Sequence, residues 1–242
     1  MTWDAGARVN DLFAASARDC TPAPARHMAN VLFVPSSRDP EAVSRCASVL
    51  SDAEKRRAQS FLVEGGEAHF TQQRAFRRYC GALAVGAGLP PSRIAFEATQ
   101  EGRPFLPELP GCWFSFSSCR LGYLGAWSST HCIGVDIEVQ TRSVEATELA
   151  QWYFSRAEAK AVEGAGERTR VRTFFQLWTL KEAALKSIGK GLPFGLDAFQ
   201  FELDPGIRIV DAPQAYGGPK RFCAYAIEAA DACAALAIRG DC

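Results

Sequence analysis

The sequence predicts an α+β protein made of two similar α/β halves with a ligand cleft between them. Helix and strand patterns are mixed along the chain, and "GAGLPPSRIAFE" (86–97) is echoed by "GKGLPFGLDAFQFE" (189–202), each directly after a long helical pattern. Such self-similarity is typical of related structural units. No low-complexity linker separates the two halves, 1–130 and 131–242, so we expect them to pack as one unit with a ligand cleft between them.

Two helices and two strands are expected in the first half. "LSDAEKRRAQSFL" (50–62) is typical of a helix that begins at Ser51 or Asp52 and carries Glu54 in its first turn. A second helix is expected over 65–88, where glycines stand at both ends. Strand patterns follow at 113–118 and 122–129.

The second half begins with "CIGVDIE" (132–138), which its alternation predicts to be a strand. A helical pattern over 145–164 is interrupted near Phe154-Ser155, and the longest helical pattern covers 168–189. The tail, 221–240, is expected to form a two-stranded ribbon.

The overall charge and the known motifs exclude several functions. Lysine plus arginine and aspartate plus glutamate both total 27, and this zero net charge argues against nucleic-acid or membrane partners. No apolar run approaches the length of a membrane span, and residues 1–20 lack a signal-peptide pattern. We therefore expect a soluble, cytoplasmic protein, and a monomer because two halves can build the cleft within one chain. The motifs of zinc ribbons, P-loop enzymes, kinases and serine hydrolases do not occur.

Two carboxylates interrupt the apolar strand pattern "IGVDIE" (133–138). Successive side chains on a strand point to opposite faces, so Asp136 and Glu138 share one face, and Val135 and Ile137 share the other. Taken alone, this pair is explained equally well by the solvated face of an edge strand or by a bound cation.

The longest helical pattern carries a third carboxylate. Trp178, Glu182 and Lys186 recur at spacings of four and therefore lie on one face of the helix. Apolar residues occupy nearly every other direction, which is typical of a buried helix. The alternative is an exposed Glu–Lys pair, but a buried carboxylate needs a partner because stranded charge is strongly unfavourable.

Together, the three carboxylates predict a site for a hard divalent cation. Mg²⁺, or Mn²⁺ in its place, takes oxygen ligands and leaves positions for water or substrate phosphate. Asp136, Glu138 and Glu182 would supply three ligands, and Lys186 would face a phosphate oxygen. Basic residues in the first half are candidates for further phosphate contacts, and they include Arg56, Arg74, Arg78 and Arg103.

These motifs, in this order, resemble one family. "GVDIE" (134–138), "YFSRAEAKAV" (153–162) and "WTLKEAALKSIGKGL" (178–192) are similar to the signature set of the Sfp-type 4′-phosphopantetheinyl transferases. The upstream "EGRPFLPELPGCWFSFSS" (101–118) is similar to the family's G-K/R-P...F-N-x-S-H-S region. The resemblance covers roughly residues 50–202.

The resemblance implies two α/β halves related by a pseudo-twofold axis, with Mg²⁺ and coenzyme A in the cleft between them. It implies that Asp136, Glu138 and Glu182 bind the metal and that Lys186 lies near the reacting phosphate. The residues expected to contact coenzyme A are Arg56, Arg74, Arg78, Arg103, Ser117, Ser118, Lys181, Lys186 and Lys190. Where the family has S-H-S, this chain has Ser117-Ser118-Cys119, so a hydroxyl replaces the imidazole expected at the 3′-phosphate.

The reaction implied by the family is attack of a carrier-protein serine on the β-phosphorus of coenzyme A, with release of adenosine 3′,5′-bisphosphate. Glu182 is the candidate base, directly or through a water, and Lys186 stabilises the leaving phosphate. The carrier is an acyl or peptidyl carrier protein, expected to dock at "TRSVEATELAQWYF" (141–154). The candidate contact residues there are Val144, Leu149, Trp152, Tyr153 and Phe154, and ordinary core packing is the alternative for some of them. Two alternatives are a Mg²⁺-dependent phosphohydrolase or nucleotidyl transferase, and a non-catalytic carrier-binding homologue.

Overall fold

The computed structural model describes residues 18–19, 28–86, 88–140, 144–228 and 231–240. The sequence expectation for 1–20 therefore lies almost wholly outside the described residues, as do positions 141–143 of the expected docking segment. The chain is a mixed α and β protein. Its first half contains β1 (Arg18–Asp19), β2 (Asn30–Pro35), α2 (Pro40–Ala47), α3 (Asp52–Gln59), α4 (Gly66–Val85), η2 (Pro91–Arg93), β3 (Glu97–Ala98), β4 (Pro104–Phe105), β5 (Trp113–Cys119) and β6 (Gly122–Ser128).

The second half follows after a short connection, 129–131. Its elements are β7 (Cys132–Val139), α5 (Ala146–Tyr153), α6 (Arg156–Gly164), α7 (Glu167–Ser187), η3 (Leu192–Phe194), η4 (Leu196–Ala198), β8 (Gln200–Glu202), β9 (Arg208–Asp211), η5 (Gln214–Tyr216), η6 (Pro219–Arg221), β10 (Phe222–Glu228) and β11 (Ala232–Arg239).

The two halves share one succession of elements. Each has a strand, two short helices, a long helix, a short two-stranded ribbon and a closing hairpin, with one 3-10 turn in the described part of the first half and four in that of the second. The strand order is also the same, because β2-β6-β5 in the first sheet corresponds to β7-β11-β10 in the second. The first sheet carries β1 as an additional edge strand. The echoed stretches at 86–97 and 189–202 occupy the same place after α4 and α7.

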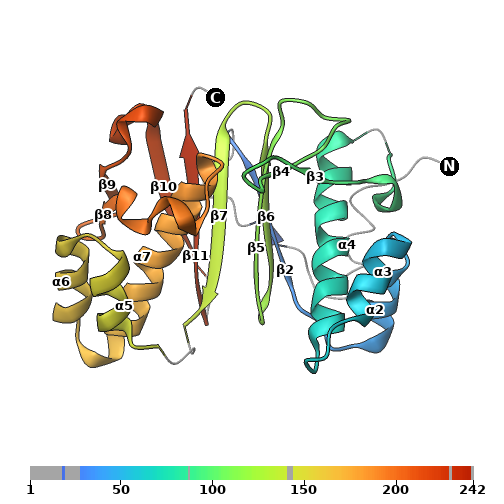
Figure 1. Cartoon of the computed structure of the whole chain (residues 1–242), viewed down its shortest axis with the longest axis horizontal. Helices are drawn as coiled ribbons and strands as arrows, with labels where there is room; N and C mark the ends of the chain where they lie inside the picture. Colours follow the sequence, from blue (N-terminus) through green and yellow to red (C-terminus); the bar gives the residue numbers. More distant parts are fainter. Residues whose placement is uncertain (1–17, 20–27, 87, 141–143, 229–230, 241–242) are drawn as a thin grey trace.

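The two sheets lie back to back in the middle of the molecule, with α4, α2 and α3 outside one sheet and α7, α5 and α6 outside the other (Figure 1). Leu124 and Ala126 of the first sheet share a buried core with Val135, Ile137 and Leu236 of the second. Burial of this apolar surface, at about 25 cal/mol per Å², holds the halves together.

Local sequence signals explain where several elements begin and end. Ser51 and Glu54 form a reciprocal capping box at the start of α3, as expected. The predicted interruption after Phe154 is a change from α5 to α6, where Ser155 and Glu158 form a second capping box. The sequence analysis missed β2 and α2, although Asp39 before Pro40 is a helix-start signal.

Gly134 lets α7 lie directly against β7. A Cβ atom at this position would lie 1.9 Å from the carbonyl oxygen of Ala183 and 2.6 Å from the backbone nitrogen of Ser187. Any side chain there would push the helix away from the strand. The glycine therefore brings the helix residues Glu182 and Lys186 close to the polar face of β7.

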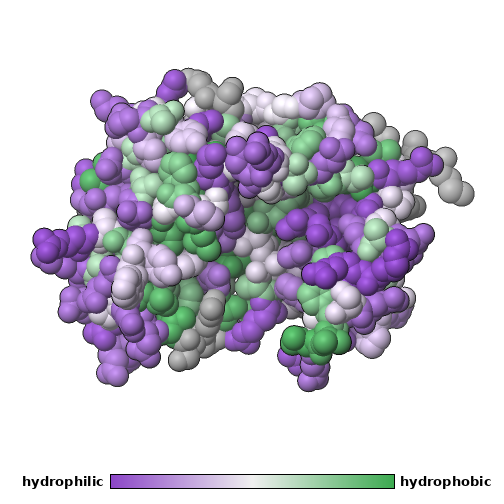
Figure 2. All heavy atoms as spheres, viewed as in Figure 1, coloured by the Kyte–Doolittle hydropathy of each residue, from purple (hydrophilic) through white to green (hydrophobic). Residues whose placement is uncertain are grey.

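In the part of the chain that the structure describes, no helix is both long and apolar enough to cross a membrane. Figure 2 shows a largely polar surface on the viewed face, with apolar residues reaching the surface in several places over the second half.

Candidate functional site

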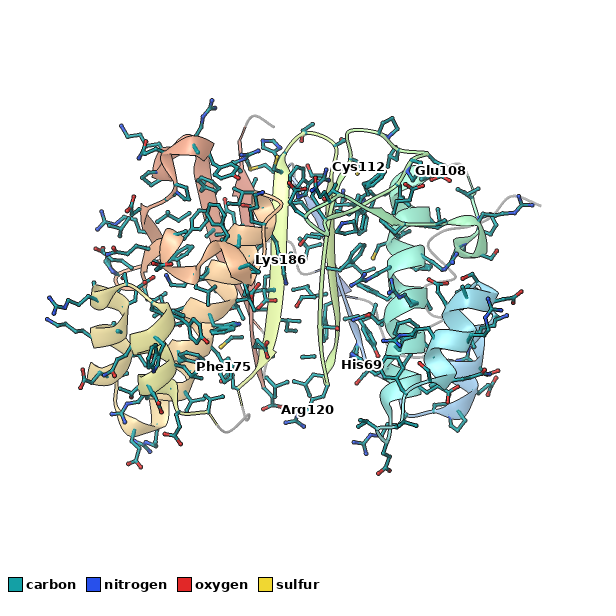
Figure 3. All side chains as sticks on the ribbon, in the orientation of Figure 1. His69, Glu108, Cys112, Arg120, Phe175 and Lys186 are labelled. Carbon is teal, nitrogen blue, oxygen red and sulfur yellow. The ribbon has the colours of Figure 1, made fainter. Side chains whose placement is uncertain are left out.

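The carboxylates of β7 and α7 face each other across the junction of strand and helix. Asp136 is 5% exposed and Glu182 is 8% exposed. Lys186 donates hydrogen bonds to Asp136 Oδ1 at 2.7 Å and to the carbonyl oxygen of Val135 at 3.1 Å. Figure 3 shows Lys186 on α7 beside β7, near the middle of the molecule. The alternating pattern of β7 thus places its apolar side chains between the sheets and its carboxylates toward α7, and Asp136 is not on a solvated face.

Glu182 has an unusual protonation behaviour. Burial raises its pKa to about 7, and the negative charge of Asp136 adds to the rise, while Lys186 opposes it and Glu138 contributes further. This shift shows that the three carboxylates act on one another electrostatically. A carboxyl group with a pKa near neutrality is suited to accept and release protons at physiological pH.

The donor chemistry fits a hard cation. Asp136 Oδ2 is buried and has no hydrogen-bond partner, an arrangement that costs about 1–3 kcal/mol unless a ligand satisfies the oxygen. Oxygen donors from Asp136, Glu138 and Glu182 are the type that Mg²⁺ prefers. Among the described residues, no three His, Cys, Asp or Glu side chains are already arranged as a metal-holding group. The ammonium group of Lys186 contacts the other oxygen of Asp136, Oδ1.

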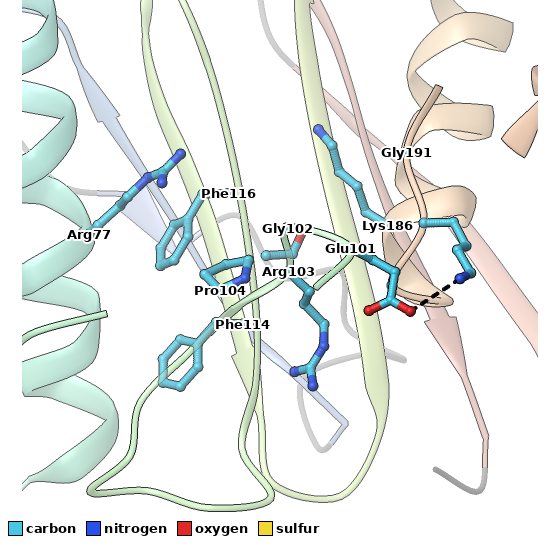
Figure 4. A pocket seen from close by; sticks show the side chains of 12 residues that line it. Arg77, Glu101, Gly102, Arg103, Pro104, Phe114, Phe116, Lys186 and Gly191 are labelled. Carbon is cyan, nitrogen blue, oxygen red and sulfur yellow. Dashed lines mark hydrogen bonds and ion pairs between the residues drawn. The ribbon is translucent and has the colours of Figure 1, made fainter. Parts of the chain in front are cut away.

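A pocket of about 230 Å³ lies beside this junction and is lined by both halves. In Figure 4, Arg77 enters from α4 and Lys186 from α7, with Gly102 and Pro104 between them. The lining residues are Arg77, Glu101, Gly102, Arg103, Pro104, Phe114, Ser115, Phe116, Lys186, Gly189, Lys190 and Gly191. Four of these are cationic, which suits a polyanionic ligand.

Three predicted residues, Arg103, Lys186 and Lys190, come together in this pocket. The Arg103 guanidinium stacks 4.0 Å from the ring centroid of Trp113, and Lys190 pairs with Glu101 at 3.4 Å. The stacked guanidinium retains donors for an anion.

Arg77 is a pocket cation that the sequence analysis missed. Its guanidinium lies 5.3 Å from the ring centroid of Phe116, and its Nε atom is buried without a hydrogen-bond partner. Burial lowers the pKa of Arg77 to about 10, and the charge of Arg74 adds to this effect. The helical spacing of α4 could have indicated Arg77, because it lies about one turn after Arg74 and therefore near the same face of the helix.

Arg78, whose contact with the ligand stays a prediction, has other partners in the structure. Its guanidinium is bound to Glu54, with a closest distance of 2.6 Å, and donates to the carbonyls of Pro91, Ser92 and Ile94. These contacts fasten α4 to α3 and to the following turn and favour a structural role.

Lys181 is likewise turned away from the pocket. It is fully buried, pairs with Glu158 at 2.8 Å, and donates to the carbonyl oxygens of Leu196 and Phe199. Burial lowers its pKa, while Glu158 raises it. These contacts link α7 to α6 and to the turn before β8, and the expected contact between Lys181 and coenzyme A stays a prediction.

The remaining predicted residues lie outside the set that lines the pocket. Arg56 is exposed on α3, and the guanidinium of Arg74 lies 5.0 Å from the ring centroid of Phe70. Ser117 donates to Asp136 Oδ1 at 2.7 Å. Their contacts with coenzyme A stay predictions.

Ser118 occupies the position where the family has histidine, and the imidazole of His69 lies next to its hydroxyl. Its hydroxyl accepts a hydrogen bond from Gln73 at 2.8 Å and lies 3.5 Å from His69 Nε2. Burial lowers the pKa of His69. Because His69 comes from α4, 49 positions away, the sequence pattern around Ser118 gave no sign of it.

Comparisons with known proteins point to one family. A family model described as the 4′-phosphopantetheinyl transferase superfamily matches residues 132–237. The chain is 30% identical over 164 residues to the 4′-phosphopantetheinyl transferase Sfp of Bacillus subtilis (strain 168), covering 64% of this chain and 72% of the relative.

Two further relatives carry the same family name. A 4′-phosphopantetheinyl transferase of Bacillus subtilis is 31% identical over 136 residues, covering 56% of this chain and 59% of that protein. The 4′-phosphopantetheinyl transferase HetI of Nostoc sp. is 27% identical over 175 residues, covering 71% of this chain and 73% of the relative. The chain thus spans between 59% and 73% of the lengths of these three relatives.

Proposed function

The chain belongs to the 4′-phosphopantetheinyl transferase superfamily, and on that premise we propose that it transfers the 4′-phosphopantetheine group of coenzyme A to a serine of an apo carrier protein. The observation that carries this proposal is the pocket that both halves line with four cations, one of which, Lys186, also pairs with Asp136 at the carboxylate-bearing junction of β7 and α7. This is an arrangement for binding a polyphosphate beside a divalent cation.

Coenzyme A is the proposed occupant of the pocket. Arg77 and Arg103 would neutralise phosphate charge from the first half, and Lys186 and Lys190 from the second. The two glycines at 189 and 191 allow a ligand to approach the backbone closely, because they carry no side chain. A ligand held from both sides is oriented as well as bound.

We propose that Asp136, Glu138 and Glu182 hold Mg²⁺, with Mn²⁺ as a substitute. When bound, the cation would supply neutralisation of the charge that grows on the pyrophosphate in the transition state. The unpartnered Oδ2 atom of Asp136 supports this assignment, as does the raised pKa of Glu182, which is caused first by burial and then by the charge of Asp136.

In the proposed reaction, the carrier serine oxygen forms a bond to the β-phosphorus of coenzyme A. The bond from that phosphorus to the bridging oxygen breaks, and adenosine 3′,5′-bisphosphate leaves with the electron pair. Glu182 accepts the serine proton, for which its raised pKa is suited. Lys186 stabilises negative charge on the leaving phosphate.

We further propose that the halves, 1–130 and 131–242, are related by a pseudo-twofold axis. Their common succession of elements and their common strand order support this relation. The proposed ligand pocket then lies where the two repeats meet.

The proposed docking surface for the carrier is the exposed end of α5. Trp152 is 77% exposed and Tyr153 is 49% exposed. Exposed aromatic side chains of this size are enriched at protein interfaces. The neighbouring Phe154 is buried against α7 and belongs to the core instead. As a partner, an acyl or peptidyl carrier protein is proposed.

The test is the intact mass of an apo acyl carrier protein and of an apo peptidyl carrier domain after incubation with this protein, coenzyme A and Mg²⁺. We expect a gain of one phosphopantetheine, abolished by EDTA. Phosphate release from coenzyme A without any carrier modification would favour a phosphohydrolase. Carrier binding without modification would favour a non-catalytic homologue.

A further inference from the structure

Two serine hydroxyls join the sheets of the two halves. β5 and β7 lie side by side, yet each is an edge strand of its own sheet. Ser115 Oγ on β5 accepts a hydrogen bond from the backbone N–H of Val135 at 3.0 Å, and Ser117 Oγ accepts one from Ile137 at 3.4 Å. The two hydroxyls therefore accept hydrogen bonds from the β7 backbone, as the carbonyl groups of a neighbouring strand would.

Ser117 makes one contact that Ser115 does not make. Its hydroxyl donates to Asp136 Oδ1 at 2.7 Å. Lys186 donates to the same oxygen at 2.7 Å, so both hydrogen bonds fall on one side of the carboxylate. The other oxygen, Oδ2, is buried and has no hydrogen-bond partner. The Asp136 carboxylate is thus fixed through Oδ1, and Oδ2 remains available to bind a ligand.

Because the Ser117 hydroxyl donates to Asp136, it has no second proton to donate to a phosphate. A serine hydroxyl has one proton to donate, and in Ser117 that proton goes to Asp136. Ser117 is also outside the set of residues that lines the pocket, whereas Ser115 belongs to it. The contact between Ser117 and a coenzyme A phosphate, expected from the sequence, competes with the contact to Asp136.

We propose that Ser117 is a positioning residue for Asp136, which orients the carboxylate from the opposite half so that Oδ2 faces the cation. The inference rests on the proposed function, because it assumes that Asp136 is a cation ligand. Hydrogen bonds of this kind to a ligating carboxylate fix its orientation and influence metal affinity. Since Ser117 lies on β5, cation binding in the second half depends on how the first half is packed against it.

The experiment measures Mn²⁺ affinity of the full chain without coenzyme A, by the electron paramagnetic resonance signal of free Mn²⁺. The variants are Ser117→Ala, its conservative counterpart Ser117→Thr, and the matched control Ser115→Ala. Both alanine variants lose one bond to a β7 backbone N–H, but only the first loses the bond to Asp136. We expect Ser117→Ala to weaken Mn²⁺ binding about 10- to 100-fold.

Ser117→Thr keeps the hydroxyl and is expected to restore most of the affinity. Ser115→Ala, which loses no contact to Asp136, is expected to change the Mn²⁺ affinity far less than Ser117→Ala does. If Ser117→Ala does not fold, Ser117→Cys takes its place, because a thiol fills the space but is a weak donor. The same direction of change is expected.

Two results overturn the inference. Equal Mn²⁺ affinity in Ser117→Ala and Ser115→Ala removes the positioning role, and a raised KM for coenzyme A in Ser117→Ala alone would then assign the hydroxyl to a phosphate. A wild-type chain that binds no Mn²⁺, even with adenosine 3′,5′-bisphosphate added, would overturn the proposed metal site and this inference with it. Carrier modification measured separately distinguishes the second result from a failure of the proposed transfer activity.

Discussion

The strand–helix units β2–α4 and β7–α7 have the same place in their halves but opposite chemistry. The side of β2 that faces α4 carries Leu32 and Val34, which pack with Phe76 of that helix. The corresponding side of β7 carries Asp136 and Glu138, opposite the carboxylate and ammonium groups of α7. One unit is an apolar core, and the other is a polar junction whose Lys186 also lines the pocket.

The difference shows that two strand–helix units with the same order of elements can carry different groups. In the first half, apolar packing between β2 and α4 stabilises the fold. This half also contributes two cations, Arg77 and Arg103, to the pocket wall. In the second half, polar groups stand between β7 and α7 where the first half has apolar side chains. These are the carboxylates and the lysine proposed for metal binding and catalysis. Destabilising polar groups are typical of functional sites, because the rest of the fold must compensate for them.

The largest effect is expected from Lys186→Met, which removes the cation that touches Asp136 and lines the pocket. Turnover in carrier modification should fall about 100- to 1,000-fold, as for the loss of a group that stabilises developing charge. Steady-state kinetics with mass detection, alongside circular dichroism to check folding, measures this. Turnover near that of the wild type would remove Lys186 from the reaction.

In the first half, Leu32→Ala should act on stability alone. Deleting a buried leucine side chain leaves a cavity and lowers the free energy of unfolding by about 2–5 kcal/mol. Urea denaturation measures the loss. The turnover of the remaining folded protein should equal that of the wild type, and a selective loss of turnover would break the contrast between the two units.

Arg103→Ala tests the contribution of the first half to binding. Loss of one hydrogen bond to a charged group, about 1.5 kcal/mol, corresponds to an increase of about tenfold in the KM for coenzyme A. Turnover at saturation should change little, because the contact is present before and during the reaction. Arg208→Ala, which removes an exposed arginine paired with Glu202, is the matched control.

The smallest effect is expected from Trp152→Ala on the exposed end of α5. Losing an interface aromatic side chain should raise the KM for the carrier about fivefold, which is about 1 kcal/mol, and leave the KM for coenzyme A unchanged. Titration of each substrate at saturating levels of the other measures both constants. An equal rise in both would place Trp152 in the structure of the site rather than at the carrier surface.

The sequence predicted those features that depend on local periodicity. The long helices, the interruption before Ser155 and the two faces of β7 followed from spacing alone, because residues on one face of a helix or strand recur at fixed intervals. The echo at 86–97 and 189–202 follows the two long helices α4 and α7 in the structure, whereas β2 and α2 went unnoticed.

Contacts between distant segments could not be predicted in the same way. Arg77 and Arg78 differ by about 100° around α4, and only the packed structure shows that Arg77 faces the pocket. Lys181 meets Glu158 from another helix, and His69 meets Ser118 from across the first half. Such partners are set by tertiary packing, which a family motif or a helical spacing does not encode.

The most direct test of the central claim is the turnover of Glu182→Gln, measured together with its coenzyme A affinity. The amide keeps the size of the side chain but is neither an anion nor a base at neutral pH. If the β7–α7 junction is the transfer site, turnover falls by far more than affinity. Near-normal turnover would contradict the assignment of the chemistry to this junction.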